Sequence, residues 1–285
     1  MRTTESGSRR PLSFYILAGF FAAFVVFLYG PMLTIYVLSF QGPRGGLTLP
    51  MNGVSLHWFR ALMGPQRTGD FVGPFVRSLA LGLIVLAATV VVSIMAGLAF
   101  RRRFFGANLI FYTAVASLIM PGLLIGLGVG LMFQITGAQP AWWSSALGAQ
   151  LTWTLPFGLL IMFAVLSRLS RSYEEAARDL GASGWQVFRH VLVPILSPGI
   201  IAVAVFAFTL SYDEFPRTLL TVGSQNTLPL EIWAMTTNVT SPALYAVGTV
   251  TTLISFVLIA LAIGLILSIE RRRLRRAVIS RGASD

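Results

Sequence analysis

The 285-residue chain contains no cysteine, no lysine and only two histidines. The absence of cysteine excludes disulfides, thiolate metal sites and a cysteine nucleophile. All 21 basic residues are arginine. Because the P-loop of Walker-type ATPases requires a lysine, the chain cannot itself be such an ATPase. GxSxG and HExxH motifs are also missing. We therefore expect a chain that is not an enzyme and that binds neither a metal nor a cofactor.

Charged residues are scarce as well. They make up 11% of the sequence, whereas 55% is hydrophobic, and soluble domains carry roughly 25% charged residues. A membrane helix needs about 20 apolar residues, so the uncharged runs predict an all-α polytopic membrane protein with six spans. One run is too long for a single crossing, and TGAQPAWWSS supplies its turn. The predicted spans are residues 14–40, 78–100, two within 104–167, 195–212 and 244–269.

The arginines predict the orientation. Most of them lie at the two chain ends and in the second and fourth connections, which six spans place on one side. The positive-inside rule makes that side cytoplasmic, together with both termini. The net charge of +11 is then a topology signal, and nucleic-acid binding is disfavoured because the arginines stand at membrane ends. His57 and His190 lie on opposite sides and cannot share a metal. The outer arginines are Arg44, Arg60, Arg67, Arg77 and Arg217.

Two segments on the predicted outer side have a recognisable pattern. SLHWFRALM, residues 55–63, places Leu56, Phe59 and Leu62 at helical spacing, which predicts a short amphipathic helix at the outer surface. TLPLEIWAM, residues 227–235, lies between the fifth and sixth spans. Each segment either packs on the protein or contacts an extracytoplasmic partner, and the sequence leaves both possibilities open.

The fourth connection, residues 168–194, is charged, and we name it the helical loop. Its pattern predicts two short helices around a sharp turn. Two capping boxes mark the helix starts, Ser172 with Glu175 and Ser183 with Gln186. Gly181 stands where a glycine in the left-handed conformation would end the first helix.

Further signals describe the faces of these two helices. Glu174 and Arg178 form an i,i+4 pair in the favoured order. The second helix has an apolar face and ends at a proline. A mere connection would need only a few residues. The loop is therefore either gripped by another protein, or Glu175 and Gly181 serve only as cap and helix stop. The predicted apolar face consists of Trp185, Phe188 and Leu192, and the predicted end of the helix is Pro194.

Glu175, Ala176 and Ala177 are followed after three residues by Gly181, and after nine more by Val191, with Val193 and Pro194 close behind. In this spacing, and in its position before the fifth span, the helical loop resembles the EAA loop of bacterial ABC importer permeases. Val191 and Val193 stand where that family favours isoleucine and leucine. The resemblance implies a coupling helix that docks in a cleft of a cytoplasmic ATPase. Glu175 would pair with a basic residue of the ATPase, and small alanines would allow close approach. The expected coupling residues are Glu175, Ala176, Ala177, Arg178, Gly181 and Pro194.

Other stretches are similar to the second permease of spermidine/putrescine-type importers, namely residues 29–40, 209–235 and 238–255. This resemblance covers nearly the whole chain and implies the MetI-like type I importer permease fold in the bacterial inner membrane. The implied partners are cytoplasmic ATPase subunits that use ATP, a second permease subunit (a homologue or a second copy) and a periplasmic solute-binding protein. The implied solute is a polyamine, and another small solute, such as an amino-acid derivative or an opine, is the alternative.

The same resemblance implies an organisation along the chain. A cytoplasmic N-terminus and a first membrane helix precede a periplasmic segment, and a permease domain containing the helical loop precedes a basic tail. The expected limits are 1–13, 14–40, 41–72, 73–269 and 270–285.

Asp213 and Glu214 stand out at the end of the fifth span. Ionisable residues in a span cost roughly 2.5–3.5 kcal/mol at its centre, and they usually line a polar path or find a partner. Two interpretations stay open. The pair could line a cation pathway, in which Tyr212 and Trp233 add cation–π contacts, although both aromatics could equally be interface anchors. Alternatively, Asp213 lies near the outer interface and pairs with Arg217 at i+4.

Two other classes of membrane protein are disfavoured. An ion-coupled secondary carrier would bury ionisable or broken-helix ion sites in its spans, and the first, third, fourth and sixth spans contain no acid or base. A membrane enzyme would need a catalytic constellation that the sequence lacks. The expected source of energy is therefore an ATPase that grips the helical loop.

Overall fold

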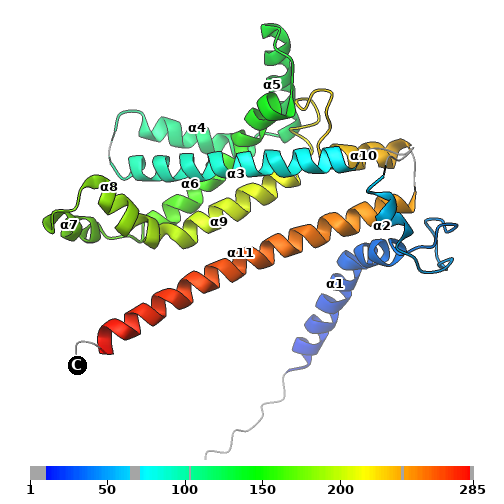
Figure 1. The fold of residues 1–285 in the computed structure, drawn as a ribbon, viewed down its shortest axis with the longest axis horizontal. Helices are drawn as coiled ribbons and strands as arrows, with labels where there is room; N and C mark the ends of the chain where they lie inside the picture. Colours follow the sequence, from blue (N-terminus) through cyan, green and yellow to red (C-terminus); the bar gives the residue numbers. More distant parts are fainter. Residues whose placement is uncertain (1–10, 65–70, 103, 239–240, 283–285) are drawn as a thin grey trace, which may run out of the picture. The chain divides into compact units, whose positions relative to one another are not determined.

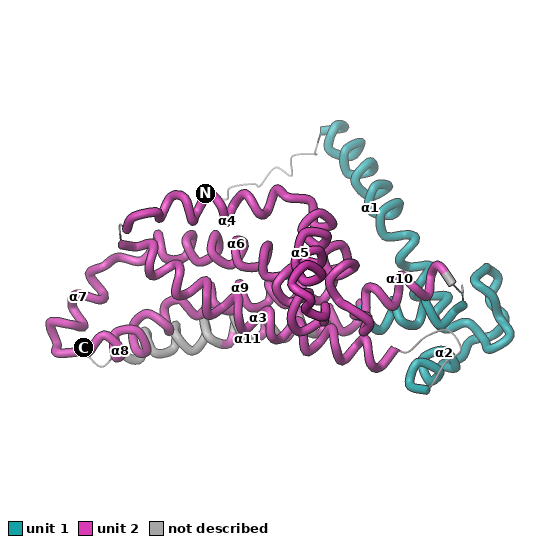
Figure 2. The backbone as a smooth tube through the Cα atoms, turned by 90° about the horizontal axis from the view of Figure 1, so that it is seen from above, with its two compact units in different colours: residues 1–66, 239–251 teal, residues 67–238, 252–285 magenta. Residues whose placement is uncertain are grey.

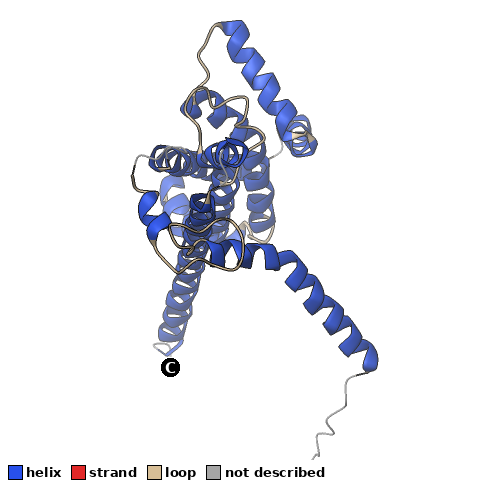
Figure 3. Ribbon diagram, turned by 90° about the vertical axis from the view of Figure 1, so that its right-hand side faces the viewer, coloured by secondary structure: helices blue, strands red, loops and turns tan. Residues whose placement is uncertain are grey.

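The computed structural model describes residues 11–64, 71–102, 104–238 and 241–282. Within these ranges every regular element is a helix, and the extended pairing is limited to one isolated bridge between Gln41 and Val54 (Figure 3). The predicted all-α class is confirmed. The following predicted features lie outside the described residues: residues 1–10 with their arginines, Arg67, Arg103 and the side chains of the basic tail 270–285.

The helices are given in chain order, and η denotes a π-helical segment. They are α1 (Leu12–Leu38), α2 (His57–Ala61), α3 (Val72–Phe100), α4 (Ala107–Ile119), α5 (Gly122–Thr136), η1 (Trp142–Ala146), α6 (Leu147–Leu166), α7 (Ser172–Asp179), α8 (Gly184–Gln186), η2 (Val187–Leu192), α9 (Val193–Tyr212), α10 (Leu228–Asn238) and α11 (Pro242–Gly282).

The number of membrane spans depends on one bent pair of helices. Among the described residues, five helical stretches are long and apolar enough to cross a membrane by themselves. α4 and α5 reach that length only together, and they are bent by 110°. The six predicted spans are found when this pair is one crossing. The five unbroken stretches are residues 12–38, 72–100, 142–166, 184–212 and 242–261.

The bend between α4 and α5 has a local cause that the sequence analysis did not use. Met120 is extended, with φ −69° and ψ 130°, because the ring of Pro121 disfavours the α conformation in the residue before it. At its far end α5 stops at Gly137, which is left-handed with φ 71°. That stop agrees with the turn predicted at residues 136–145.

The chain forms two compact units, which are coloured separately in Figure 2. The first comprises residues 1–66 and 239–251. It contains α2, which is shorter than the amphipathic helix predicted over residues 55–63. Leu62 is buried. Leu56 is 53% exposed, because it precedes the first helical turn and does not follow helical spacing.

The second unit, residues 67–238 and 252–285, is built around α3, α6 and α9. These three helices pack on one another along their lengths (Figure 1). Small residues permit the close approach: a Cβ placed on Gly158 of α6 would lie 2.7 Å from Thr89 Cγ2 of α3. Packing through small residues is a common way for helices to associate in membranes. The helical loop lies before α9 and a polar segment follows α9, so the two segments are at opposite ends of this three-helix core.

Candidate functional site

The first helix of the helical loop, α7, starts one residue earlier than the predicted cap requires. Its N-cap is Arg171, and the Glu175 N–H donates to the Arg171 carbonyl at 3.1 Å. Ser172 is already helical, and its hydroxyl lies 2.6 Å from Ser170 Oγ. The Glu175 N–H thus bonds to a backbone carbonyl, and the N-cap side chain makes no capping hydrogen bond, so the predicted Ser172–Glu175 capping box is wrong.

The turn after α7 forms as predicted. Gly181 adopts the left-handed conformation with φ +83°. Its N–H donates to the Arg178 carbonyl at 2.8 Å, and the Ala182 N–H donates to the Ala177 carbonyl at 3.0 Å. These two bonds form a Schellman motif, which satisfies the last carbonyls of the helix. The turn therefore has a fixed shape.

The second helix of the loop starts as predicted but does not end as predicted. Ser183 Oγ accepts from the Gln186 N–H at 3.3 Å, and Gln186 Oε1 accepts from the Ser183 N–H at 2.7 Å, which confirms the second capping box. The helical backbone then continues to Tyr212, so Pro194 marks no end. Pro194 stands in the first turn of α9, directly after η2. A π turn rearranges the hydrogen bonds and so accommodates a residue without an N–H.

The apolar face of this second helix differs from the prediction at one residue. Leu192 is buried and Phe188 is half-buried, but Trp185 is 65% exposed. Val187 takes its place in the core. The hydrogen bonds of a π-helix join residues five apart, and η2 begins at Val187 and ends at Leu192, which both belong to the same core cluster. Trp185 packs against the Phe188 ring instead, with 5.5 Å between centroids.

The predicted coupling residues of α7 lie on two different sides of the helix. Glu175 and Ala176 are exposed. Ala177 packs against the core cluster that contains Val187. The predicted pair of Glu174 and Arg178 is confirmed, with 3.7 Å between Oε2 and Nη2. The helix therefore presents Glu175 outward while holding Glu174 and Ala177 inward.

Apolar side chains are also exposed on the helical loop, and sequence reasoning missed them. Leu180 is 90% exposed and Tyr173 is 58% exposed. With Ala176 they occupy positions i, i+3 and i+7, which lie on one side of a helix. Trp185 adds a further exposed ring. These exposed apolar side chains have no covering element among the described residues.

The inward side of α7 contacts the end of α3. The Arg101 guanidinium forms an ion pair with Glu174 Oε1, and Arg171 Nη2 donates to the Arg101 carbonyl at 2.6 Å. A cleft of about 800 Å³ opens between these segments. Its lining residues are Leu98, Ala99, Arg101, Arg102, Phe104, Arg171, Glu174, Glu175, Arg178, Gly184, Phe188 and Leu192.

At the other end of α9, the two acids differ in burial. Asp213 is exposed, whereas Glu214 is 3% exposed. Arg217 pairs with Glu214, with 3.4 Å between Nη1 and Oε2, and its backbone N–H donates to Glu214 Oε1 at 2.8 Å. The predicted pair of Asp213 and Arg217 is therefore wrong. It assumed a continuing helix, but α9 ends at Tyr212 and the chain turns.

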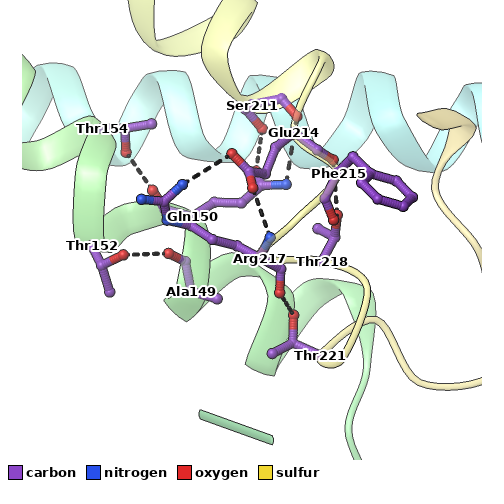
Figure 4. Close-up of polar contacts among 10 residues, drawn as sticks. All are labelled: Ala149, Gln150, Thr152, Thr154, Ser211, Glu214, Phe215, Arg217, Thr218 and Thr221. Carbon is purple, nitrogen blue, oxygen red and sulfur yellow. Dashed lines mark hydrogen bonds and ion pairs between the residues drawn. The ribbon is translucent and has the colours of Figure 1, made fainter. Parts of the chain in front are cut away.

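Side chains from α6 and α9 complete the surroundings of this pair (Figure 4). The Arg217 guanidinium carbon lies 4.4 Å from the centroid of the Trp153 ring, a cation–π contact. Ser211 Oγ donates to Gln150 Oε1, and both residues are buried. The sequence analysis did not identify Trp153, Gln150 or Ser211, because their partners are distant in the chain.

The broken helix α5 packs on the segment that carries Arg217. A Cβ on Gly122 would lie 2.8 Å from Arg217 Nη1, and one on Gly126 would lie 2.8 Å from the Arg217 carbonyl oxygen. A Cβ on Gly130 would lie 2.8 Å from the Leu220 carbonyl oxygen. These glycines recur at i, i+4 and i+8 on one face of α5. They let its backbone approach closely and enclose the buried ion pair.

The predicted pathway residues differ in burial and in their contacts. Tyr212 is 3% exposed and stacks on Phe208, with 5.7 Å between ring centroids. Trp233 of α10 is 49% exposed and packs on Phe215. Asp213 is thus exposed and Tyr212 is buried. In the part of the chain that the structure describes, no group of three or more histidine, aspartate or glutamate side chains could hold a metal ion.

The sequence is similar to several polyamine permeases. The spermidine/putrescine transport system permease protein PotC of Escherichia coli (strain K12) is 28% identical over 243 residues, which is 85% of this chain and 90% of PotC. The putrescine transport system permease protein PotI of the same strain is 29% identical over 232 residues, 78% of this chain and 80% of PotI.

Solved structures share the fold of this chain, and a family model matches its sequence. A bacterial ABC transporter involved in the import of the acidic polysaccharide alginate has a chain with TM-score 0.71 and 15% identity, covering 90% of this chain and 95% of that one. The MetNI methionine ABC transporter gives TM-score 0.55 and 16% identity, covering 70% and 95%. The family model named "binding-protein-dependent transport system inner membrane component" matches residues 89–276. This chain belongs to that family of inner membrane components of binding-protein-dependent transport systems.

Proposed function

We propose that this chain is the permease subunit of an ATP-driven importer that moves a polyamine, such as spermidine or putrescine, across the bacterial inner membrane. A periplasmic binding protein delivers the solute, a second permease completes the pore, and cytoplasmic ATPases drive alternating access. The observation that carries the proposal is the exposed helical loop with its EAA spacing. The domain limits given above, with a permease domain over residues 73–269, belong to the same proposal.

The ATPase docks on the outward side of α7. Glu175 is exposed there and free to meet a basic side chain of the ATPase. The exposed Tyr173, Leu180 and Trp185 supply apolar area beside it. The Schellman turn at Gly181 and the capping box at Ser183 keep the loop rigid. A rigid loop passes the movement of the ATPase to α9, with which its second helix is continuous.

Replacing Glu175 by alanine is expected to lower solute-stimulated ATPase activity roughly ten-fold or more, because truncating one partner of a buried interfacial charge pair costs about 2–5 kcal/mol. Membrane insertion should not change. The measurement is ATPase activity of the reconstituted transporter with and without solute. Asp179→Ala, which removes another exposed carboxylate of α7, is the matched control. Wild-type stimulation in Glu175→Ala would remove this residue from the docking surface.

Asp213 is the acid best placed to meet a cationic solute. Glu214 is already neutralised by Arg217, whereas Asp213 is exposed at the end of α9. Trp233 is half-exposed and could stack on a cation. Tyr212 is buried against Phe208 and has a packing role. The polyamine pathway that we propose therefore uses Asp213 and Trp233.

Asp213→Asn is expected to raise the KM for putrescine or spermidine roughly two- to five-fold, the effect of losing one exposed charge pair of about 0.5–1 kcal/mol. Basal ATPase activity should stay the same. Asp213→Glu keeps the charge and is the control that should retain the wild-type KM. Uptake kinetics that do not distinguish the two variants would exclude Asp213 from the solute pathway.

The proposal as a whole is tested by reconstituting this chain with a cytoplasmic ATPase, a second permease and a periplasmic binding protein from the same organism. ATPase activity is then measured against a panel of solutes. Stimulation by putrescine or spermidine supports the polyamine importer. Stimulation by a neutral or anionic solute alone keeps the importer and rejects the polyamine. Uptake driven by an ion gradient without ATP would instead support a secondary carrier.

A further inference from the structure

Two neighbouring glutamates of α7 have opposite surroundings. Glu175 is exposed. The Glu174 side chain is only 16% exposed, and its carboxylate binds Arg101, at the end of α3, through one oxygen and Arg178 through the other. The Arg101 side chain is likewise 16% exposed. Because Glu174 faces the permease itself, its role differs from that of the outward Glu175.

A second bond links the same two helices in the opposite direction. Arg171, the N-cap of α7, donates from Nη2 to the Arg101 carbonyl at 2.6 Å. That carbonyl follows the last residue of α3, where helix carbonyls have no partner within the helix and favour a cation. Arg101 therefore contacts α7 twice: its side chain pairs with Glu174, and its backbone carbonyl accepts a hydrogen bond from Arg171.

α7 depends on such links for its position. It has eight residues, none of which is fully buried, and isolated helices shorter than about 12–15 residues are marginal in water. Its inward Ala177 packs on the core cluster near η2. α3 in turn packs along both α6 and α9. A rigid link between α7 and α3 would therefore transmit movement of α7 to the centre of the second unit directly, and not only through the backbone that connects α7 to α9.

We propose that Arg101, Arg171 and Glu174 form a clamp that makes α7 and α3 one rigid body. Movement of the coupling helix then reaches α3 directly, in addition to reaching α9 through the continuous backbone. These are positioning residues, since they act through α7 and touch neither solute nor nucleotide. An isolated ion pair at a fully exposed surface often contributes little, but this one is half-buried and is paired with a second, reciprocal bond. The transmission role rests on the proposed importer function.

The rigidity of the clamp can be measured without solute or ATPase. The natural absence of cysteine allows spin labels to be placed only at Met95→Cys on α3 and Asp179→Cys on α7, both of which are exposed positions. The expected distance distribution is narrow, and its width should at least double in Arg101→Ala and in Glu174→Ala. Arg102→Ala removes the exposed neighbouring arginine and should leave the width unchanged. Wild-type widths in both clamp variants would overturn the clamp.

Transmission is tested by restoring the link covalently. The variant Arg101→Cys/Glu174→Cys should lose most solute-stimulated ATPase activity in the complete transporter. A short bifunctional thiol reagent that joins the two cysteines should bring it back to at least half of the wild-type value. No recovery after verified cross-linking would overturn the transmission role, because α7 and α3 would then have to move apart. If solute does not stimulate the ATPase activity of the wild-type transporter, the importer proposal is contradicted. The widths of the spin-label distance distributions would still test the clamp.

Discussion

Replacing Arg217 by methionine is expected to destabilise the folded permease by about 3–5 kcal/mol, the cost of leaving one charge of a buried pair without its partner. Glu214 is 3% exposed, and its carboxylate accepts from the Arg217 side chain and from the Arg217 backbone N–H. The guanidinium also lies over Trp153. Removing the guanidinium abolishes the ion pair and the cation–π contact, and leaves a buried carboxylate without its cation. The midpoint of thermal unfolding in detergent measures the loss.

A double variant separates the charge from the other contacts of Arg217. Glutamine at position 214 is uncharged but keeps an oxygen that can accept the backbone N–H of residue 217. Adding Glu214→Gln to Arg217→Met should therefore recover most of the stability, since replacing a buried ion pair by uncharged residues is often neutral. If the double variant is no more stable than Arg217→Met, the contact with Trp153 is the main contribution. A stable Arg217→Met single variant would contradict the prediction.

The helical loop could largely be predicted from the sequence because its signals are local. Gly181 ends α7 and Ser183 starts the next helix, each through bonds to residues within five positions. The capping prediction at Ser172 failed by a single residue, because α7 begins one residue earlier than predicted and its N-cap is therefore a different residue. The error at Trp185 arose because a π turn cannot be distinguished from an α turn by apolar spacing alone.

The ion pairs of Glu214 with Arg217 and of Glu174 with Arg101 could not be predicted in the same way. Arg101 and Glu174 are 73 residues apart in the chain, and only the packing of α3 beside the loop brings them together. Helical spacing allows Asp213 to pair with Arg217, which is one of the two interpretations of the sequence, but the helix ends at Tyr212 and Arg217 pairs with Glu214. Local rules describe neither the end of a span nor the contacts made across the core.

The bend between α4 and α5 is an intermediate case. Pro121 restricts Met120 to an extended conformation, and this rule can be read from the sequence. The 110° angle depends in addition on the glycines of α5, which let its backbone approach the Arg217 carbonyl. A proline signals that a helix can break, and the packing partner decides the direction of the second half.

Gly158→Leu is expected to have the second large effect, a loss of about 3 kcal/mol or more from overpacking. Gly158 of α6 lies where α3, α6 and α9 meet. A Cβ there would lie 2.7 Å from Thr89 Cγ2 and 3.2 Å from Val203 Cγ1, and closer still to Ser93 Oγ. These neighbours are branched or short side chains of the facing helices and cannot move aside without separating the helices. The variant should lose its monodisperse peak in size-exclusion chromatography.

Gly148→Leu is the matched control for this prediction. It lies on the same helix, and a Cβ at Gly148 meets no atom within 4 Å. Both substitutions relieve the same glycine backbone entropy and add the same apolar side chain, so their effects on helix propensity should cancel. A difference in stability between them therefore measures helix packing alone. If Gly158→Leu and Gly148→Leu unfold at the same temperature, close contact of α3, α6 and α9 does not hold the second unit together. The path that we propose from α7 through α3 would then lack a rigid core to act on.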